Sequence, residues 1–577
     1  MRILPFLAVA GLLAAASPDI RQELDLRVPM RDGVHLSTNV FRQATPERLP
    51  TILVRTPYGK PNQLTPYYRG FVERGYALVL QDVRGRYASE GMFDPPRQET
   101  NDADDTLNWI ARQAWSNGRV GMLGGSYLGI TQWKAALSRN PHLKAIFPVV
   151  AGCEEYHDRF YSAGGAMKLG QRLVWLSENL RAPGVYRTDF RKFIWSVPLR
   201  IADRVATGGR TVGFFQTVLD HPTYDNYWRS VSTCGQIDTV RIPVFIAGGW
   251  YDNFVMSDLE AFRLMRGMGR HVRAMVGPWA HNMSYAFPQF SFGADARIPL
   301  RRWQFEWFDR YVRDGAPSEE TAPGAPLTIF VMGINRWREE QEWPLARTRP
   351  TALYLSSGGK ANTVGGNGTL RHRPLGAEPP DQFIYDPKNP APTTGGSVCC
   401  NPVVLPPGPL DQRPVERRRD VLVYTSEPLK HDLEVTGPIR VVLWVATSAP
   451  DTDFTAKLVD VHPDGYARIL TDGILRLRYR DSLEKPVTAR PGGVYRITID
   501  AGVTSNVFLT AHRIRLEISS SNFPRFDRNP NTGRPVADEK EYRKASQTVY
   551  HDGARTSHVI LPVIPPAPVA VMPGAVR

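Results

Sequence analysis

One strand–turn–helix pattern constrains the fold of this chain more than any other feature. The apolar run 120–124 leads into a Gly-Gly-Ser turn at Ser126, and a mostly apolar, helix-like segment follows at 128–137. Such a turn would expose the Ser126 hydroxyl at the carboxyl edge of a sheet, where the helix N-terminus favours negative charge. A phosphate-binding loop is a poorer interpretation, because neither G-x-G-x-x-G nor Gly-Lys-Ser/Thr is present. The pattern predicts a nucleophile elbow, with its second glycine at Gly129, one place later than in G-x-S-x-G.

Around this pattern, apolar strand-like runs alternate with amphipathic helix-like segments, which predicts a mainly parallel α/β sheet with helices on both faces. A segment with frequent aromatic residues at helical spacing interrupts the alternation and indicates an inserted helical cap. Beyond residue 326, from "LTIFVMG" onward, short alternating runs and turn residues predict an antiparallel sandwich. We expect residues 1–16 to be a signal peptide, 17–151 and 239–320 a catalytic α/β domain, 152–238 its cap, and 326–565 a C-terminal β-sandwich.

The formal charge of +14 raises the question of a nucleic-acid partner. The arginines are scattered, however, and at 475–480 (LRLRYR) they alternate with apolar residues, which predicts a half-buried strand with a basic, solvated face. The sequence has no long basic run and no zinc-knuckle spacing. We therefore expect no nucleic-acid partner, no metal and no organic cofactor.

The N-terminus has the features of a targeting segment. Arg2 precedes an apolar run at 3–16 that is too short to span a bilayer, and Ala14 and Ala16 form a small-x-small cleavage site. We expect no membrane span in the rest of the chain and an exported protein, either periplasmic or secreted. The sequence does not give the oligomeric state, and a homodimer stays open.

Export permits disulfides, but the chain has only four cysteines. Cys153 and Cys234 can form one bridge, and the adjacent Cys399 and Cys400 can form another. Buried free thiols are an equally good interpretation. Neither pattern resembles a metal site.

A serine nucleophile needs a base, and the base needs a group that orients it. His281 follows a strand-like run and a Gly-Pro-Trp turn, and Asp252 follows the preceding run in "GGWYDNF". Asp258 competes for the role of the acid, but its context is that of a helix start. In this fold type the order along the chain is serine, acid, histidine, so we predict a triad of Ser126, Asp252 and His281.

Acyl transfer also needs donors for the developing oxyanion. The backbone N–H of Tyr127, directly after the nucleophile, supplies one. The second donor in this fold usually follows an early strand, and there "RTPYGK" places Tyr58. We predict that the Tyr58 hydroxyl is this donor; the alternative is that Tyr58 only packs.

Long motifs resemble the cocaine esterase / X-prolyl dipeptidyl-peptidase family of serine hydrolases. They include "RTPYGK", "DVRGRYASEG", "SNGRVGMLGGSYLGITQW", "GGWYDNF", "GPWAH" and "DTDFTAKLVDVHPDG". The resemblance implies an α/β-hydrolase fold with an inserted helical cap and a C-terminal jelly-roll-like β-sandwich. It implies the same triad and the same oxyanion donors, and it accounts for the displaced glycine, because G-x-S-Y-x-G is the family's form. It also implies that Trp175 and Phe254 line the acyl pocket.

The resemblance implies two classes of substrate, which differ in charge. Family members that hydrolyse α-amino acid esters have acidic residues just after the triad aspartate, whereas this chain has Asn253 and Phe254. We therefore expect a small-molecule ester, in preference to an amide, with an apolar or aryl acyl group. The first alternative is X-Pro dipeptidyl-peptidase or α-amino acyl hydrolase action, for which acids of the cap would bind an ammonium group: Glu154, Glu155 and Asp158. The second is an inactive hydrolase that binds a glycan or a protein.

Overall fold

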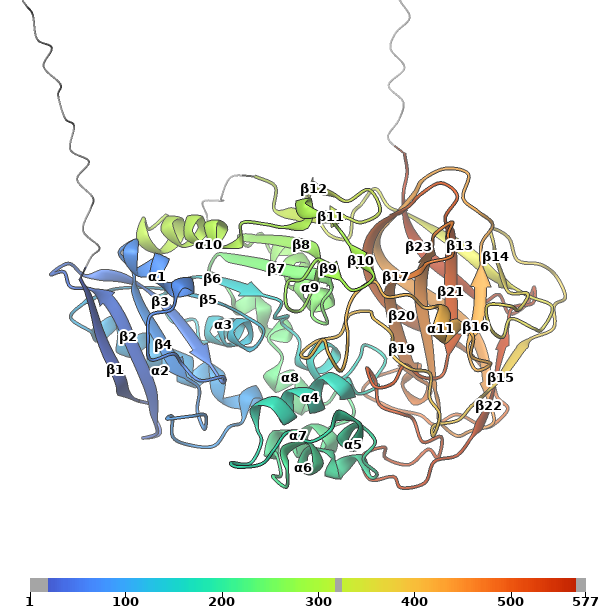
Figure 1. Cartoon of the computed structure of the whole chain (residues 1–577), viewed down its shortest axis with the longest axis horizontal. Helices are drawn as coiled ribbons and strands as arrows, with labels where there is room; N and C mark the ends of the chain where they lie inside the picture. Colours follow the sequence, from blue (N-terminus) through green and yellow to red (C-terminus); the bar gives the residue numbers. More distant parts are fainter. Residues whose placement is uncertain (1–18, 317–323, 567–577) are drawn as a thin grey trace, which may run out of the picture.

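The computed structural model describes residues 19–316 and 324–566. The predicted signal peptide, residues 1–16, lies outside the described residues. Figure 1 shows an N-terminal sheet with its helices, a C-terminal body of strands, and a group of short helices that lies next to both. No helix within the described ranges is long and apolar enough to cross a membrane.

The N-terminal sheet has ten strands in the order β1-β2-β4-β3-β5-β6-β7-β8-β11-β12. The strands from β4 to β11 in this order pair in parallel, whereas β1, β2 and β12 pair antiparallel at the two edges. The strands are β1 (Ile20–Pro29), β2 (His35–Gln43), β3 (Leu49–Thr56), β4 (Ala77–Asp82), β5 (Ser116–Gly125), β6 (Leu143–Val149), β7 (Val244–Tyr251), β8 (Val272–Ala280), β11 (Leu327–Val331) and β12 (Arg336–Glu340).

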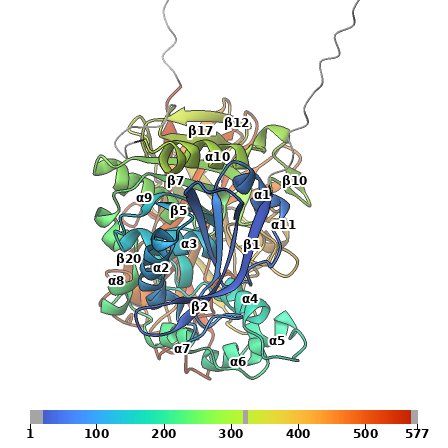
Figure 2. The ribbon, with the colours of Figure 1, turned by 90° about the vertical axis from the view of Figure 1, so that its left-hand side faces the viewer.

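Both faces of this sheet are apolar because helices cover both. In β4, Ala77 and Val79 belong to one buried cluster, and Leu78 and Leu80 belong to another on the opposite face. The first cluster packs on α2 (Pro95–Arg112), α3 (Tyr127–Leu137) and α9 (Val255–Gly267), and the second on α1 (Pro66–Glu73) and α10 (Leu300–Phe308) with the π-helical turn η5 (Asp309–Arg313). Figure 2 shows α2 and α3 on the side of the sheet away from α1. This is the predicted α/β-hydrolase arrangement.

One strand that was expected in the C-terminal sandwich lies in the N-terminal sheet. We expected "LTIFVMG" to begin the C-terminal sandwich at residue 326, but β11 pairs in parallel with β8 and extends the first sheet. An apolar strand after a helix fits either sheet by its periodicity, so the sequence does not decide between them. The second sheet begins only at β13, which starts at Arg349.

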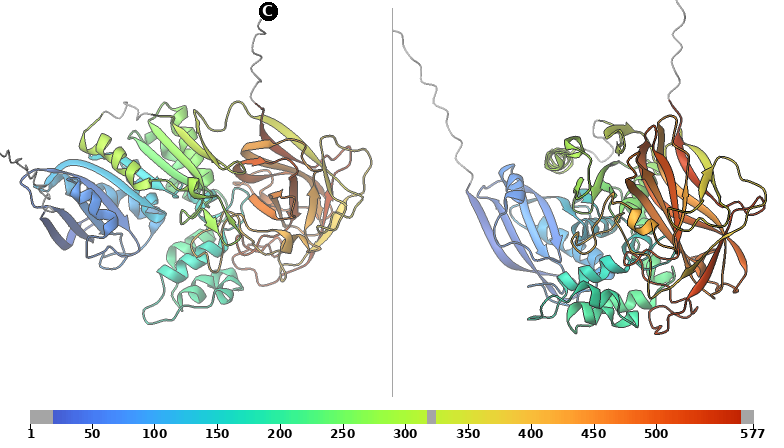
Figure 3. Two further views of the ribbon diagram at one scale, coloured as in Figure 1. Left: turned by 45° about the horizontal axis from the view of Figure 1, so that its top comes forward. Right: turned by 45° about the vertical axis from the view of Figure 1, so that its right-hand side comes forward.

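The cap consists of short helices around an aromatic core. Trp228, Phe215 and Tyr156 are fully buried in that core, which also receives Phe523 from the C-terminal body. Figure 3 shows this group of helices against both bodies in each view. Its elements are η1 (Glu155–Phe160), α4 (Leu169–Asn179), α5 (Phe190–Ile194), η2 (Leu199–Ile201), α6 (Ala202–Thr207), α7 (Gly213–Asp220), α8 (Asn226–Val231) and η3 (Cys234–Thr239).

The C-terminal body is β-rich, with eleven strands in one mixed sheet, most of whose pairings are antiparallel. The finer jelly-roll topology stays a prediction. The strands are β13 (Arg349–Ser356), β14 (Thr369–Arg371), β15 (Asp381–Tyr385), β16 (Leu422–Thr425), β17 (Leu433–Thr447), β18 (Asp453–Val461), β19 (Ala467–Arg476), β20 (Val494–Phe508), β21 (Arg513–Ser519), β22 (Ala545–Tyr550) and β23 (His558–Ile564).

The interpretation of residues 475–480 as a strand with a solvated basic face is also wrong. The strand β19 ends at Arg476, and a short 3-10 turn follows. Arg476 is buried and forms ion pairs with Asp453 and Asp527, at 2.9 and 2.8 Å. Acidic residues distant in the sequence neutralise this arginine, and a local alternation of residue types does not reveal such partners.

Candidate active site

Four predicted site residues lie at one edge of the N-terminal sheet. Tyr58 follows β3, Ser126 follows β5, Asp252 follows β7 and His281 follows β8. These strands are parallel and close together in the sheet, so their carboxyl ends meet at the same edge. The order of the strands thus brings together residues that are up to 223 positions apart in the sequence.

Ser126 occupies a sharp turn between β5 and α3. Its backbone has φ 57° and ψ −126°, a conformation that costs energy for a residue with a side chain. Two glycines make the turn fit: a Cβ on Gly124 would lie 2.5 Å from the Leu128 Cβ, and one on Gly129 would lie 2.4 Å from the Ala151 Cβ. The displaced glycine is thus required for the close approach of α3 to Ala151.

The predicted triad is assembled. The Nε2 atom of His281 lies 2.9 Å from the Ser126 Oγ, and its Nδ1 lies 2.6 Å from the Asp252 Oδ1. Asp252 is fully buried, and the backbone N–H of Phe254 donates to its other carboxylate oxygen at 3.1 Å. With the imidazole proton on Nδ1, Nε2 can accept the serine proton, which is the arrangement of an activated nucleophile.

The competing acid Asp258 is not part of this chain of hydrogen bonds. It lies in the first turn of α9, and its Oδ1 accepts a hydrogen bond from the backbone N–H of Gly152 at 2.9 Å. Burial, with the negative charge of Asp252, raises its pKa well above the usual range. Asp258 therefore holds the start of the cap against α9.

Tyr58 is placed as a neutral hydrogen-bond donor. The indole Nε1 of Trp175 donates to its hydroxyl oxygen at 3.1 Å. Burial raises the pKa of Tyr58, against the opposing effect of its hydrogen bonds with Trp175 and Ser126. The phenol therefore keeps its proton at neutral pH and can donate it toward an oxyanion beside Ser126.

Tyr127 contributes through its backbone and is held by its side chain. It is the first residue of α3, so its N–H is one of those that a helix leaves without an intrahelical partner. Its hydroxyl donates to Glu99 at 2.6 Å, and Glu99 forms a buried ion pair with Arg55, also at 2.6 Å. Burial and the charge of Glu99 raise the pKa of Tyr127 well above its usual value. This anchoring fixes the first turn of α3 beside Ser126.

A cavity opens at Ser126 between the sheet edge and the cap, and we call it the acyl cavity. Both predicted pocket residues, Trp175 and Phe254, line it. None of the described residues that line it is an aspartate or a glutamate. Its wall consists of Tyr58, Pro95, Ser126, Tyr127, Ile130, Arg159, Phe160, Arg172, Trp175, Leu176, Phe214, Phe215, Phe254, Cys399 and Cys400.

Among the wall residues that were not predicted from the sequence, four are charged or carry sulfur: Arg159, Arg172, Cys399 and Cys400. Arg172 precedes Trp175 by three positions on α4, and that spacing, which puts both on one helix face, was an available signal. No sequence signal places Arg159 in the cavity. The disulfide Cys399–Cys400 comes from the C-terminal body, and only the tertiary structure brings it to the cavity.

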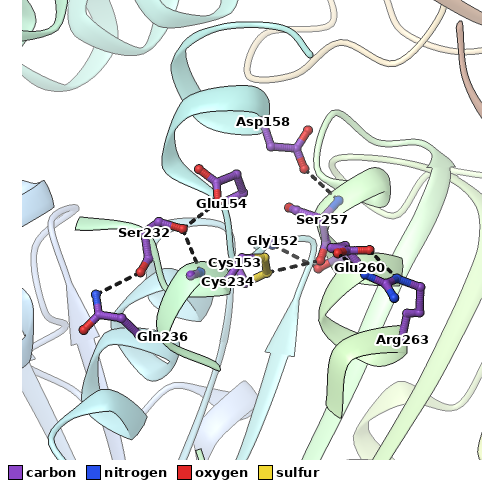
Figure 4. Close-up of a disulfide and its surroundings, with 12 residues drawn as sticks. Gly152, Cys153, Glu154, Asp158, Ser232, Cys234, Gln236, Ser257, Glu260 and Arg263 are labelled. Carbon is purple, nitrogen blue, oxygen red and sulfur yellow. Dashed lines mark hydrogen bonds and ion pairs between the residues drawn. A yellow bond between two sulfur atoms is a disulfide. The ribbon is translucent and has the colours of Figure 1, made fainter. Parts of the chain in front are cut away.

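The other disulfide, Cys153–Cys234, joins the start of the cap to its end, and Figure 4 shows the acidic residues around it. Glu154 accepts a hydrogen bond from the Ser232 hydroxyl at 2.6 Å, and Asp158 accepts one from the backbone N–H of Ser257 at 3.0 Å (Figure 4). The third acid of the cap, Glu155, pairs with Lys134 and Arg159. All three carboxylates thus have internal partners, and none is an acid of the cavity wall.

The comparisons with known proteins agree with this geometry. Residues 32–283 match the X-Pro dipeptidyl-peptidase (S15) family, and residues 322–560 match the X-Pro dipeptidyl-peptidase C-terminal non-catalytic domain. A cocaine esterase from Rhodococcus sp. (strain MB1 Bresler) is 40% identical over 571 residues, which cover 94% of this chain and 98% of that protein. This chain belongs to the S15 family. The resemblance seen in the sequence motifs is confirmed.

Other similar proteins carry the names of different activities. A putative Xaa-Pro dipeptidyl-peptidase from Bacillus anthracis is 24% identical and covers 81% of this chain and 72% of its own. The structure of an α-amino acid ester hydrolase superposes with a TM-score of 0.81 at 27% identity, over 97% of this chain and 98% of the other. Together with the triad, these relatives identify this S15 chain as a serine hydrolase.

Proposed function

We propose that this S15 enzyme hydrolyses small-molecule carboxylic esters, and amides more slowly, whose acyl groups are apolar or aryl. One observation carries the proposal: Ser126 Oγ lies 2.9 Å from the His281 Nε2 at the base of an aromatic-walled cavity. The cavity wall offers Trp175, Phe160 and Phe254 to an apolar acyl chain. Acylase action is the slower, amide-directed part of the same proposal.

The mechanism follows from the positions of the groups. His281 takes the Ser126 proton as Oγ attacks the substrate carbonyl, a step to which general-base action contributes about 10²–10⁴-fold. The Tyr127 N–H and the Tyr58 hydroxyl donate to the oxyanion. His281 then protonates the leaving oxygen, and the acyl group stays on Ser126. Water, activated by His281, attacks the acyl-enzyme and releases the acid.

X-Pro dipeptidyl-peptidase or α-amino acyl hydrolase action is the alternative, because S15 relatives carry these names. Both need a carboxylate that binds the substrate's ammonium group. The described wall of the acyl cavity has no such group, and it has two arginines instead. The positive charges of these two arginines would repel the substrate's ammonium group. An inactive binding protein is disfavoured by the assembled triad.

Covalent labelling and turnover test the proposal together. A fluorophosphonate probe should label the parent and not Ser126→Ala, and the parent should hydrolyse p-nitrophenyl butyrate faster than Gly-Pro p-nitroanilide. Faster turnover of the anilide would leave the triad intact and favour the dipeptidyl-peptidase. An unlabelled, inactive parent of native fold would overturn the proposal.

We also propose that the protein is exported, to the periplasm or beyond. The apolar N-terminal run and the two disulfides support this, because disulfides persist in oxidising compartments. Expression of the full chain, with cell fractionation and N-terminal sequencing, tests it. A cytoplasmic protein that keeps residues 1–16 would contradict it.

A further inference from the structure

Arg172 is a cation without a partner in the acyl cavity. Its side chain lines the cavity, and within residues 19–316 and 324–566 it forms no hydrogen bond or ion pair. Its Nε is buried and unpaired, and its guanidinium lies 5.5 Å from the centre of the Phe160 ring. A guanidinium withdrawn from water without a carboxylate is unfavourable, so its position calls for an anionic partner that the described residues do not supply.

Arg159 adds a second unsatisfied donor to the same wall. Its Nη1 donates to Glu155 at 2.7 Å, but its Nη2 is buried and has no partner. Glu155 does not neutralise Arg172, since Lys134 also pairs with this carboxylate, at 3.2 Å. Lys134 and Arg159 therefore share the Glu155 carboxylate, and Arg172 has no ion pair with it.

The charge of these arginines acts inside the cavity. Burial and the charge of Arg159 lower the pKa of Arg172 to about 9, which leaves its guanidinium protonated at neutral pH. Both arginines act against the effect of burial on the pKa of Tyr58, so their field reaches the oxyanion site. The arginines can therefore act in two ways: they bind an anionic group of the substrate, or they only assist Tyr58.

We propose that Arg172, assisted by Arg159, binds a carboxylate carried by the substrate's acyl group, so that the preferred substrates are half-esters of aliphatic dicarboxylic acids. This inference rests on the proposed ester hydrolysis and names its substrate class. The aromatic wall accepts a methylene chain, and the planar guanidinium is suited to bidentate pairing with a carboxylate. The lack of an acid on the described wall leaves the anion without a repelling neighbour.

The test compares two isosteric esters, the anionic monoethyl glutarate and the neutral ethyl glutaramate, by ethanol release. The parent should show a kcat/KM about 10- to 100-fold higher for the anion, the gain expected from a charge-assisted pair. Arg172→Met should remove this preference, so that kcat/KM falls about 10- to 100-fold for monoethyl glutarate and much less for ethyl glutaramate and p-nitrophenyl butyrate. Arg172→Lys should keep part of it. Arg191→Met, an exposed arginine of the cap, is the matched control and should change nothing.

Equal losses on anionic and neutral esters in Arg172→Met would overturn the inference, because they would mean that the arginine acts through Tyr58 or the fold. A parent enzyme that does not prefer the anionic ester would also overturn it. So would a parent that prefers a carboxylate on the leaving group, which 4-(butyryloxy)benzoate tests. A labelled parent without anion preference fails this inference alone, whereas an unlabelled parent fails the proposed function. Calorimetric binding of glutarate to Ser126→Ala, and its loss on adding Arg172→Met, tests the site without turnover.

Discussion

The indole Nε1 of Trp175 donates a hydrogen bond to the hydroxyl oxygen of Tyr58 across 3.1 Å. The tyrosine belongs to the sheet edge and the tryptophan to the cap. This hydrogen bond therefore links the α/β domain to the inserted cap beside Ser126. Since the phenol oxygen accepts from Trp175, its own proton is free to point elsewhere, toward the oxyanion. The ring of Trp175 also stacks on Tyr127, with 10° between the planes. One cap residue thus contacts the side chains of both residues that supply the proposed oxyanion donors.

Replacing Trp175 should slow the chemical step. Trp175→Phe keeps an aromatic ring but removes the donor, and the loss of one net hydrogen bond of about 1 kcal/mol corresponds to about fivefold in kcat. Tyr58→Phe removes the oxyanion donor itself and should cost about 10²–10³-fold. Steady-state kinetics with p-nitrophenyl butyrate measures both. A Tyr58→Phe variant as active as the parent would show that Tyr58 only packs.

Gly129 should be the sensitive glycine of the nucleophile turn. In Gly129→Ala the new Cβ meets the Ala151 Cβ at 2.4 Å, so α3 must shift, which should cost about 1–3 kcal/mol in unfolding free energy together with activity. Gly125→Ala is the matched control, because its nearest contact, 3.5 Å from the Val149 carbonyl oxygen, is ordinary. Denaturant unfolding and turnover of both variants check the contrast, and equal effects would contradict it.

The Cys153–Cys234 disulfide should stabilise the fold rather than the chemistry. It closes a loop with a sequence separation of 81, and loops of that length correspond to about 4 kcal/mol of unfolded-state entropy. The double variant Cys153→Ala/Cys234→Ala should therefore unfold at a clearly lower temperature. Its kcat, measured well below that temperature, should change little. Thermal unfolding with and without a reductant gives the same comparison on the parent.

The Cys399–Cys400 disulfide should have the opposite profile. It closes no long loop, but both residues line the acyl cavity. Cys399→Ala/Cys400→Ala should leave the unfolding temperature close to that of the parent and change KM across a series of acyl chain lengths. Unchanged selectivity along that series would show that this pair does not contact the acyl group.

His551 should make the stability of the C-terminal body depend on pH. It is buried between Asp381, at 2.9 Å from Nε2, and Glu378, at 3.1 Å from Nδ1. Burial alone lowers the pKa of His551, but these two carboxylates outweigh it and raise the pKa. A raised pKa means that the stabilisation is complete below the unfolded pKa near 6.5 and is lost as the pH rises through the folded value.

The variant His551→Gln should therefore lose more stability at pH 6 than at pH 9, by about 3–5 kcal/mol at the lower pH, where a buried ion pair is broken. Burial alone raises the pKa of Asp381, but its hydrogen-bond partners, His551 first among them, outweigh burial and lower it. The contribution of Asp381 to stability is therefore lost only as the pH falls. Urea unfolding at the two pH values measures the difference. A larger loss at pH 9 would reverse the assigned sign.

Predictions from the sequence succeeded where local pattern and chain order were enough. Ser126, Asp252 and His281 each follow an apolar run, and a parallel sheet brings the ends of such runs to one edge. They failed for the strand at 327–331, whose periodicity fits two sheets equally, and for Arg476, whose partners Asp453 and Asp527 come from other segments. The interpretation of Trp175 and Phe254 as cavity residues came from the family resemblance, and both line the cavity.

By itself the sequence determined the α/β-hydrolase domain, its nucleophile turn and the triad, because each depends on residue types at fixed distances from strand ends. Only the tertiary structure decided what the substrate meets beyond Ser126. The cavity wall combines the sheet edge, the cap and the C-terminal Cys399–Cys400 pair, and each alone is an ordinary feature of its own segment. Whether Arg172 has a carboxylate partner depends on everything packed around it, and no local pattern encodes that.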